Sequence, residues 1–453
     1  MKNTPLELGT QNIGKLLMQY AIPSIIATTA AALYSITDSI FIGHGVGPLA
    51  ISGLAITFPL MNLSAALGTM VGVGASALLS MRLGQKDYDS ANKIVGNVFL
   101  MILIISVIFT IPTLIFLKPI LYFFGASEDT LPYAYDFMFI ILSGTVITHL
   151  YFSFNALIRA SGQPLKSMTA TIMTVVVNVI LNPLFIFGFG WGMRGSALAT
   201  IISQVVVLVW QLHLFNRRDS FLKIQRQSLR FNSKIAFDSI AIGLSPFLMN
   251  ATSSVIVIII NQGLLKYGGD MAVGAFGIVN RIAMLFVMIV IGLNQGMQPI
   301  AGYNYGARLY PRVTEVLKKS VIIATLIMSV GFLTAQFMPH QIVSMFTSDL
   351  ELITHSERGL RIVFFFYPLI GFQMVVSTFF QSIGKPGKAI FLSLTRQVIF
   401  LIPFLFILPH YYGISGVWIA MPASDAISIV MSALLIYAQI KEFRRAEAQS
   451  GVV

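Results

Sequence analysis

The sequence predicts an all-α integral membrane protein in which twelve transmembrane helices form two parallel six-helix lobes around a central cavity. Three observations lead to this prediction. Hydrophobic residues make up 56% of the 453 residues and charged residues only 10%. Long apolar segments recur from one end of the chain to the other, and the second half of the chain repeats motifs of the first half.

Twelve segments contain about 20 or more mostly apolar residues, which is enough for an α-helix to cross a bilayer. A soluble core could not bury so many helices that are apolar on all sides. The expected helices cover residues 16–42, 49–80, 94–117, 131–158, 165–190, 195–215, 236–264, 271–302, 317–338, 357–381, 389–408 and 414–440.

The net charge of +12 reflects the orientation of the chain in a membrane. When the loops are assigned to alternate sides, 22 of the 29 Lys and Arg residues fall on the side that carries both termini, and five fall on the other side. Basic residues accumulate on the cytoplasmic side, so both termini are expected in the cytoplasm and the protein in the cell (inner) membrane. This distribution of basic residues argues against nucleic-acid binding, and the sequence contains no nucleic-acid recognition motif.

The chain has no cysteine, which excludes disulfides, thiolate metal sites and thiol catalysis. At the N-terminus, a short polar lead runs directly into a segment longer than the apolar region of a signal peptide. We therefore expect the helix at residues 16–42 to remain in the mature protein.

Four motifs of the first half recur in the same order in the second half at nearly one offset in residue number, which indicates an internal duplication. Because six helices return the chain to the same side, the two repeats have the same orientation. The predicted domains are an N-lobe at 1–215, a basic cytoplasmic linker at 216–235 and a C-lobe at 236–453. The paired motifs are Arg82-Leu83-Gly84-Gln85-Lys86 with Asn304-Tyr305-Gly306-Ala307-Arg308, Ala160-Ser161-Gly162-Gln163-Pro164 with Ser382-Ile383-Gly384-Lys385-Pro386, Pro23 with Pro246, and Arg194-Gly195-Ser196-Ala197 with Ser415-Gly416-Val417-Trp418.

Asp38 is an acid inside the first apolar segment, where a charge costs roughly 2.5–3.5 kcal/mol on insertion scales. At the offset that relates Pro23 to Pro246, its counterpart is Asn261, a neutral side chain of the same shape. Packing would suit either residue, but only the acid can exchange a proton or hold a cation. Asp38 is therefore the predicted ion-coupling residue.

Uncharged polar residues of the first lobe are the expected partners of Asp38. Asn178 and Asn182 lie four residues apart and so share one helix face, while Thr200 and Asn155 lie on the neighbouring segments. Pro183 leaves the carbonyl of Val179 as a further possible ligand. The alternative is that these amides only hydrogen-bond between helices.

The second lobe contains the charged residues Arg281, Arg396 and Asp425 within its apolar segments. Arg281 and Asp425 should reach similar depths, which predicts a buried ion pair that fixes packing, with a charged wall of a substrate cavity as the alternative. Three further residues, Tyr34, Met61 and Met249, are candidates for lining a substrate site, because methionine adapts its shape and aromatic rings hold cations.

The motifs resemble those of the multidrug and toxic compound extrusion (MATE) family over all twelve helices. They are TDSIFIGHGVGPLAISGLAITFPL, the RLGQKD loop, the RASGQP turn and the NPLFIFG segment. The chain is similar to the DinF-like and MepA-like branch of that family, because it has Arg281 and Asp425. It also lacks the mid-membrane acids that NorM-like members carry on the seventh and tenth helices.

The resemblance implies cation-coupled efflux of organic cations and amphipathic drugs by alternating access, with H+ or Na+ as the coupling ion. It implies no enzyme activity, no metal and no other cofactor, and we expect a monomer in the bilayer. In this branch, the residues matching Asp38, Asn178, Asn182 and Thr200 form the coupling site. Relatives often carry Asp where this chain has Asn182, and the loss of that charge disfavours a Na+ site.

Three other classes of protein are weighed against this interpretation. A flippase for lipid-linked oligosaccharide precursors would need a large cationic groove, whereas the first lobe is expected to be acidic. A membrane enzyme would need clustered nucleophiles or metal ligands, and the six His fall on separate loops or helices. A passive channel is disfavoured by the duplicated lobes and the Gly- and Pro-broken helices. His149 is expected to be a hydrogen-bonded interior residue.

Overall fold

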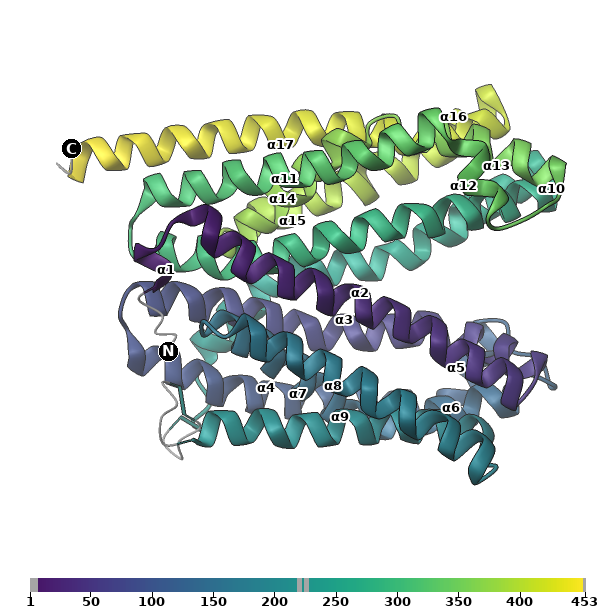
Figure 1. Ribbon diagram of the computed structural model, residues 1–453, viewed down its shortest axis with the longest axis horizontal. Helices are drawn as coiled ribbons and strands as arrows, with labels where there is room; N and C mark the ends of the chain where they lie inside the picture. The colour runs from purple at the N-terminus through teal and green to yellow at the C-terminus, as the bar shows by residue number, and fades with distance from the viewer. Residues whose placement is uncertain (1–6, 218–221, 224–227, 451–453) are drawn as a thin grey trace. The chain divides into compact units, whose positions relative to one another are not determined.

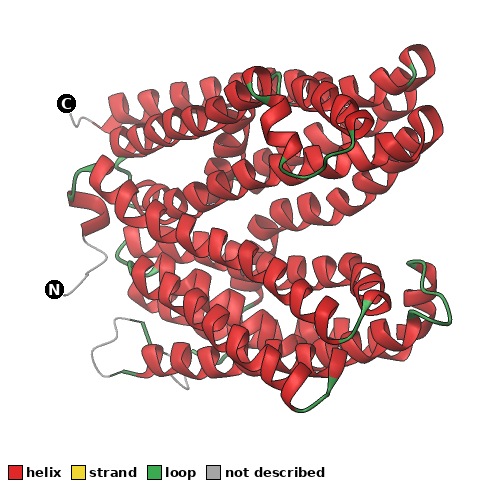
Figure 2. Cartoon of the chain, turned by 45° about the vertical axis from the view of Figure 1, so that its right-hand side comes forward, coloured by secondary structure: helices red, strands yellow, loops and turns green. Residues whose placement is uncertain are grey.

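The computed structural model describes residues 7–217, 222–223 and 228–450, and every regular element in these ranges is a helix (Figure 2). The predicted all-α fold class is therefore confirmed. Parts of the expected linker at 216–235 lie outside the described residues, as do Lys2, Arg218 and Arg226 among the basic residues.

The helices of the first half follow one another with short connections, in purple to teal in Figure 1. In chain order they are α1 (Glu7–Thr10), α2 (Ile13–Gly45), α3 (Pro48–Gly84), α4 (Tyr88–Ile115), α5 (Leu117–Phe123), α6 (Leu131–Ser143), α7 (Thr145–Ala160), α8 (Pro164–Pro183), the π-helical segment η1 (Leu184–Gly188) and α9 (Gly192–Asn216).

The helices of the second half are drawn in teal to yellow in Figure 1. They are α10 (Ser233–Gly306), α11 (Tyr310–Phe337), α12 (Pro339–Ser344), α13 (Leu350–Val363), α14 (Tyr367–Ser382), α15 (Pro386–Leu394), the π-helical segment η2 (Thr395–Leu401), α16 (Ile402–Tyr412) and α17 (Ile414–Ser450).

The twelve expected apolar segments all have helical counterparts in the described ranges. Nine helices are long and apolar enough to cross a bilayer, and two more spans are helix pairs that bend by 57° (α6 with α7) and 53° (α13 with α14). The element α10 covers two of the expected segments and consists of two helices. They meet at Gly269, where the backbone leaves helical geometry with φ of 67° and ψ of −168°. The chain is thus a multi-pass membrane protein by the length and composition of its helices.

The duplication is also visible in the backbone conformation of equivalent loop residues. Lys86 and Arg308, which occupy the last positions of one pair of repeated motifs, have φ of 60° and 59°, an uncommon conformation for a residue with a side chain. Gly162 and Gly384, which are paired in the next repeated motif, also have positive φ. Equal backbone conformations at equivalent loop positions support the repeat found in the sequence.

The described residues form two compact units whose boundaries fall inside helices. Ile26–Phe247 belongs to the first unit, while Gly9–Ile25 and the chain from Leu248 onward belong to the second. The first part of α2 therefore packs with the second half of the chain, and the first part of α10 packs with the first half. The boundaries at 25 and 247 lie at equivalent positions of the two repeats, so each repeat contributes the start of its first helix to the other unit.

Glycines allow close backbone contact where these exchanged helix segments pack. A Cβ added to Gly243 on α10 would overlap the carbonyl oxygen of Met70 on α3, and one added to Gly74 would overlap the carbonyl of Ser239. In the second unit, a Cβ on Gly292 would lie 2.6 Å from the Cα of Ile25 on α2. Small residues at such crossings let helix backbones approach closely.

We expect Gly243→Ala to destabilise the protein by roughly 1–3 kcal/mol, because its methyl group would meet backbone atoms that cannot rotate away. Thermal unfolding in detergent measures the effect. Gly277→Ala is the matched control, because Gly277 lies on the same helix α10 and its Cβ would meet no atom within 4 Å. Equal melting of the two variants would contradict the close contact at Gly243.

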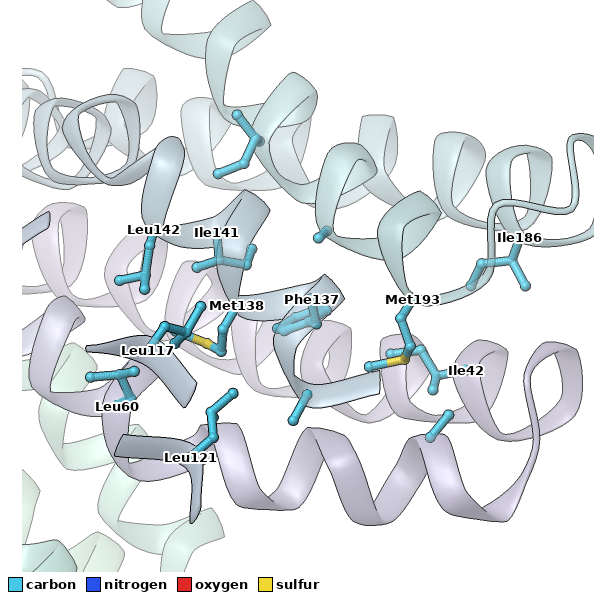
Figure 3. Packing of buried hydrophobic residues seen from close by; sticks show 14 residues of the cluster. Ile42, Leu60, Leu117, Leu121, Phe137, Met138, Ile141, Leu142, Ile186 and Met193 are labelled. Carbon is cyan, nitrogen blue, oxygen red and sulfur yellow. The ribbon is translucent and has the colours of Figure 1, made fainter. Parts of the chain in front are cut away.

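A cluster of buried apolar side chains in the first unit holds α2 against its neighbours (Figure 3). Its members come from α2, α3, α5, α6, η1 and α9, and the labelled residues are Ile42, Leu60, Leu117, Leu121, Phe137, Met138, Ile141, Leu142, Ile186 and Met193. Ile42 lies one helical turn after Asp38 and is fully buried. The cluster therefore fixes which face of α2 points into the unit.

Candidate ion-coupling site

Asp38 lies on the interior face of α2. Its residue is 9% exposed, whereas the apolar neighbours Ile36 and Ile40 are 57% and 50% exposed. The helix thus turns apolar side chains outward and its carboxylate inward, which is the arrangement expected for an acid within a membrane span. The carboxylate must then be satisfied by other groups of the first unit.

Two side chains donate hydrogen bonds to the same oxygen of Asp38. Asn182 Nδ2 on α8 donates to Asp38 Oδ1, and Ser196 Oγ on α9 donates to it at 2.8 Å. Asn182 and Ser196 have no exposed surface. Hydrogen bonds to an ionised carboxylate are stronger than bonds between neutral groups, so Asp38 ties α2 to both helices.

A second layer of polar groups adjoins this pair. Asn178 Nδ2 donates to Thr200 Oγ1 at 3.2 Å, and the hydroxyl groups of Thr200 and Tyr34 lie 3.0 Å apart. Asn182 Nδ2 also lies 3.5 Å from Asn178 Oδ1, which joins the two layers. The structure therefore brings together the predicted residues Asp38, Asn178, Asn182 and Thr200, and it adds Tyr34 to the same network.

Asn182 also presents an oxygen that is left without a donor. Among the described residues, Asn182 Oδ1 is buried and has no hydrogen-bond partner. An unsatisfied buried acceptor costs about 1–3 kcal/mol. The same amide faces Asp38 with its nitrogen, so its oxygen would meet a protonated Asp38 or a bound cation only if the amide turned over. The carboxylate of Asp38 is the group of this site that can take up one positive charge.

Ser196 is a partner that the sequence analysis did not identify. It belongs to the repeated motif Arg194-Gly195-Ser196-Ala197, in which its counterpart in the second repeat is Val417. The first repeat is thus polar where the second is apolar, as it is acidic at Asp38 where the second has Asn261. A comparison of the two repeats in the sequence, position by position, would have identified Ser196 as a candidate partner of Asp38.

The predicted place of Asn155 beside Asp38 is wrong. Asn155 Nδ2 on α7 donates to Thr171 Oγ1 at 2.9 Å, near the start of α8, whereas Asp38 binds Asn182 at the end of α8. Eleven residues separate Thr171 and Asn182, which corresponds to roughly 16 Å along the helix axis. Asn155 lies on a neighbouring helix, as predicted, but at a different depth.

The predicted Arg281–Asp425 ion pair is also wrong. Asp425 on α17 is 5% exposed and pairs with Arg396 on η2, whose Nε lies 2.6 Å from Asp425 Oδ1. Arg281 on α10 is exposed and has no ion pair among the described residues. Equal depth in the membrane does not determine the direction of a side chain around its helix. Arg396 reaches Asp425 because η2 packs directly against α17.

The remaining candidates for a substrate site are half-buried residues in separate units. Met61 packs against the cluster of Figure 3, and its sulfur accepts a hydrogen bond from Thr57 at 3.7 Å. Met249 lies on α10 in the second unit, and its carbonyl accepts a hydrogen bond from Ser253 at 2.7 Å. Met61 therefore has a packing role in the first unit, and a role of either residue in substrate binding stays a prediction.

His149 is a buried structural residue, as predicted. Its Nδ1 lies 2.9 Å from the hydroxyl of Ser106 on α4, and its Nε2 lies 2.8 Å from the carbonyl oxygen of Ser64 on α3. Both ring nitrogens are therefore occupied by groups of neighbouring helices. This residue joins α3, α4 and α7.

A duplicated set of membrane-spanning helices with a buried, hydrogen-bonded carboxylate in one repeat defines the class of secondary transporters built from parallel repeats. The MatE family model matches this chain twice, at residues 23–184 and 244–407. The chain belongs to the MatE family, and the resemblance given by its motifs is confirmed. Each match covers most of one repeat, in agreement with the duplication.

Relatives of this chain match it over nearly their whole lengths. The multidrug export protein MepA of Staphylococcus haemolyticus (strain JCSC1435) is 26% identical over 426 residues, which cover 94% of each chain. A crystal structure of a MATE transporter in a bent conformation has a TM-score of 0.92 and 26% identity, and covers 99% of each chain. The multidrug transporter DinF-BH, solved in complex with a bound compound, has a TM-score of 0.88 and 38% identity over 95% of this chain and 96% of its own.

Proposed function

We propose that this protein is a secondary active multidrug efflux transporter, which exports organic cations and amphipathic drugs in exchange for H+ or Na+. Membership of the MatE family and the similarity to multidrug transporters support the direction and the class of substrate. The observation that carries the proposal is the buried carboxylate of Asp38, held by Asn182 and Ser196 next to an unsatisfied oxygen.

The proposed transporter is a monomer in the cell (inner) membrane with both termini in the cytoplasm. The excess of Lys and Arg on the side that carries the termini supports this orientation. The N-lobe at 1–215 and the C-lobe at 236–453 are the proposed moving parts, joined by the linker at 216–235. Asn155, Arg281, Asp425, Tyr34, Met61 and Met249 remain candidates for contributing to ion coupling or to substrate binding.

Coupling follows from what a positive charge does to the contacts of Asp38. The ionised carboxylate accepts strong hydrogen bonds from α8 and α9. Neutralising it weakens both bonds and loosens the attachment of α2. The carboxylate would also attract a cationic drug, which it holds less well once protonated. Exchange then requires that the protonated and drug-bound forms favour different conformations of the transporter.

The proton is the coupling ion that the residues of this site favour. A Na+ ion needs several oxygen ligands and gains from more than one negative charge, but Asp38 has neutral amides and hydroxyls as its partners. Asp136, a further acid of the first unit, lies 2.9 Å from Arg194 in an ion pair, and no hydrogen bond among the described residues joins Asp136 to Asp38. A proton requires only the single carboxylate.

Transport in proteoliposomes under separate gradients tests this function. We expect ethidium to accumulate when the lumen is acidic and Na+ is equal on both sides, because protons leaving the lumen drive the dye inward. A Na+ gradient at uniform pH should leave dye accumulation at the level of liposomes without protein. Accumulation under the Na+ gradient alone would assign Na+ as the coupling ion. Accumulation under neither gradient would contradict cation-coupled antiport.

A further inference from the structure

We propose that the segment before α10 is a fixed strap, which stays fastened to α4 during transport and makes the start of α10 follow the first unit without slack. The strap comprises residues 228–232, near the end of the predicted linker at 216–235. From the sequence, the linker is expected to connect two lobes, whereas its contacts make the strap a part of the first unit. The statement about motion rests on the proposed transport function.

Asn97 on α4 holds the strap with both ends of its amide group. Its Nδ2 donates to the carbonyl oxygen of Arg230 at 3.1 Å, and its Oδ1 accepts a hydrogen bond from the backbone N–H of Asn232 at 2.7 Å. The same Nδ2 donates to the carbonyl oxygen of Lys93, one turn earlier on α4, at 2.9 Å. Asn97 has no exposed surface. Release of the strap would therefore leave a buried amide without its partners, which is costly.

The linker also lies directly against the backbone of α4. A Cβ added to Gly96 would lie 2.1 Å from the carbonyl oxygen of Ser228, so the approach requires a glycine. Ser228 is buried, although it belongs to a connection between helices. Earlier in the linker, Leu222 is buried and the N–H of Lys223 donates to Asn92 Oδ1 on α4 at 2.9 Å. The linker thus contacts α4 at two places.

The strap fixes the start of α10. Asn232, whose N–H is held by Asn97, accepts hydrogen bonds at its Oδ1 from the backbone N–H groups of Lys234 and Ile235, at 3.0 and 3.2 Å. It therefore caps donors that the first turn of the helix leaves free. Hydrogen bonds join α4, the strap and α10 in series. Because α10 passes into the second unit after Phe247, it carries a movement of the first unit into the second.

The first repeat has a corresponding fastening made of different residues. The start of α2 belongs to the second unit, where Arg312 on α11 donates to the carbonyl oxygen of Gln11 at 2.6 Å and to Asn304 Oδ1 at 2.9 Å. Asn12 then caps α2 by accepting a hydrogen bond from the N–H of Gly14 at 2.9 Å. Because the holding side chains differ in type and position between the repeats, inheritance from a common ancestor does not explain both fastenings.

Trypsin can probe the strap at a single peptide bond. The side chain of Arg230 is exposed, but the hydrogen bonds to Asn97 hold the backbone on both sides of Phe231. When opening is fast relative to cleavage, the cleavage rate follows the population of the opened strap. In detergent, we expect Asn97→Ala to raise the initial rate of cleavage after Arg230 tenfold or more. Gly96→Ala should do the same, because its methyl group displaces Ser228.

Two controls separate release of the strap from a general loosening of the protein. Gly387→Ala, in the first turn of α15, adds the same methyl group where no atom lies within 4 Å, and should leave the cleavage rate within twofold. The bond after Arg308, an exposed residue of the second unit, is the reference in each digest and should be cut at an unchanged rate. Unchanged cleavage after Arg230 in both Asn97→Ala and Gly96→Ala overturns the fastening, as does an equal rise at both bonds.

The unmodified protein tests whether the strap stays fastened during transport. In proteoliposomes with the cytoplasmic side outward, we expect the rate of cleavage after Arg230 to stay within twofold when an acidic lumen drives ethidium accumulation. A larger increase during turnover would mean that the strap detaches in each cycle, and would overturn the proposal. If ethidium does not accumulate, the proposed transport function fails and the statement about motion falls with it. The cleavage rates of the resting variants then still decide whether the strap is fastened to α4.

Discussion

Asp38→Asn should reduce dye accumulation driven by a pH gradient to the level of liposomes without protein. The substitution copies Asn261 of the second repeat at nearly constant volume, so it removes titration without leaving a cavity. The amide oxygen of Asn can still accept the hydrogen bonds from Asn182 and Ser196. The variant should therefore fold and still bind drug, while losing the group that exchanges the proton.

The control for this experiment is the same substitution at Asp136. That acid lies in the same unit, but its side chain is 34% exposed and pairs with the exposed Arg194. Ion pairs of this kind contribute about 0–1 kcal/mol, so Asp136→Asn should keep gradient-driven transport. Full transport by Asp38→Asn at matched protein levels would contradict its role as coupling acid and would direct attention to Asp425.

Much of the fold could be predicted from the sequence because hydropathy and internal repetition are properties of the chain itself. Apolar segments of sufficient length must become helices in a bilayer, since each helix satisfies its own backbone. The break of α10 at Gly269 illustrates the value of the repeat. This glycine is the counterpart of Gly47, which separates α2 from α3, so a turn between two expected helices falls at the equivalent place in both repeats.

The partners within the site were less predictable, because hydropathy gives the depth of a residue but not its direction. Asn178 and Asn182 were correctly grouped because their spacing on one helix fixes a common face. Asn155 and Asp425 depend on how separate helices pack and rotate against each other. Their partners, Thr171 and Arg396, became visible only in the three-dimensional arrangement.

The boundaries of the two compact units also depend on packing. Division by chain order separates the repeats at the linker, whereas the contacts place Gly9–Ile25 with the second unit and the first part of α10 with the first. The bare backbones at Gly243 and Gly292 permit these crossings. No hydropathy pattern marks them, because an apolar helix start looks the same whichever neighbour it contacts.

Asp425→Asn should lower the stability of the protein by roughly 1.5–3 kcal/mol, because it removes the buried carboxylate that accepts a charge-assisted hydrogen bond from Arg396, whose side chain is 28% exposed. Asp425 is 5% exposed and Arg396 Nε donates to it at 2.6 Å, so the partial exposure of Arg396 offsets only part of the lost contact. Thermal unfolding in detergent, followed by tryptophan fluorescence, to which the buried Trp418 on the same helix α17 contributes, measures the loss.

Two further variants separate the ion pair from other roles of these residues. Arg281→Gln changes an arginine that is exposed and has no ion pair among the described residues, so the melting temperature should hardly change. Removing both charges together, as Arg396→Met with Asp425→Leu, should recover most of the stability, because a well-packed apolar pair is often as stable as a buried ion pair. If Asp425→Asn melts like the unmodified protein and alters only drug affinity, Asp425 lines a substrate site. Its carboxylate would then act on the drug and would not hold Arg396 in place.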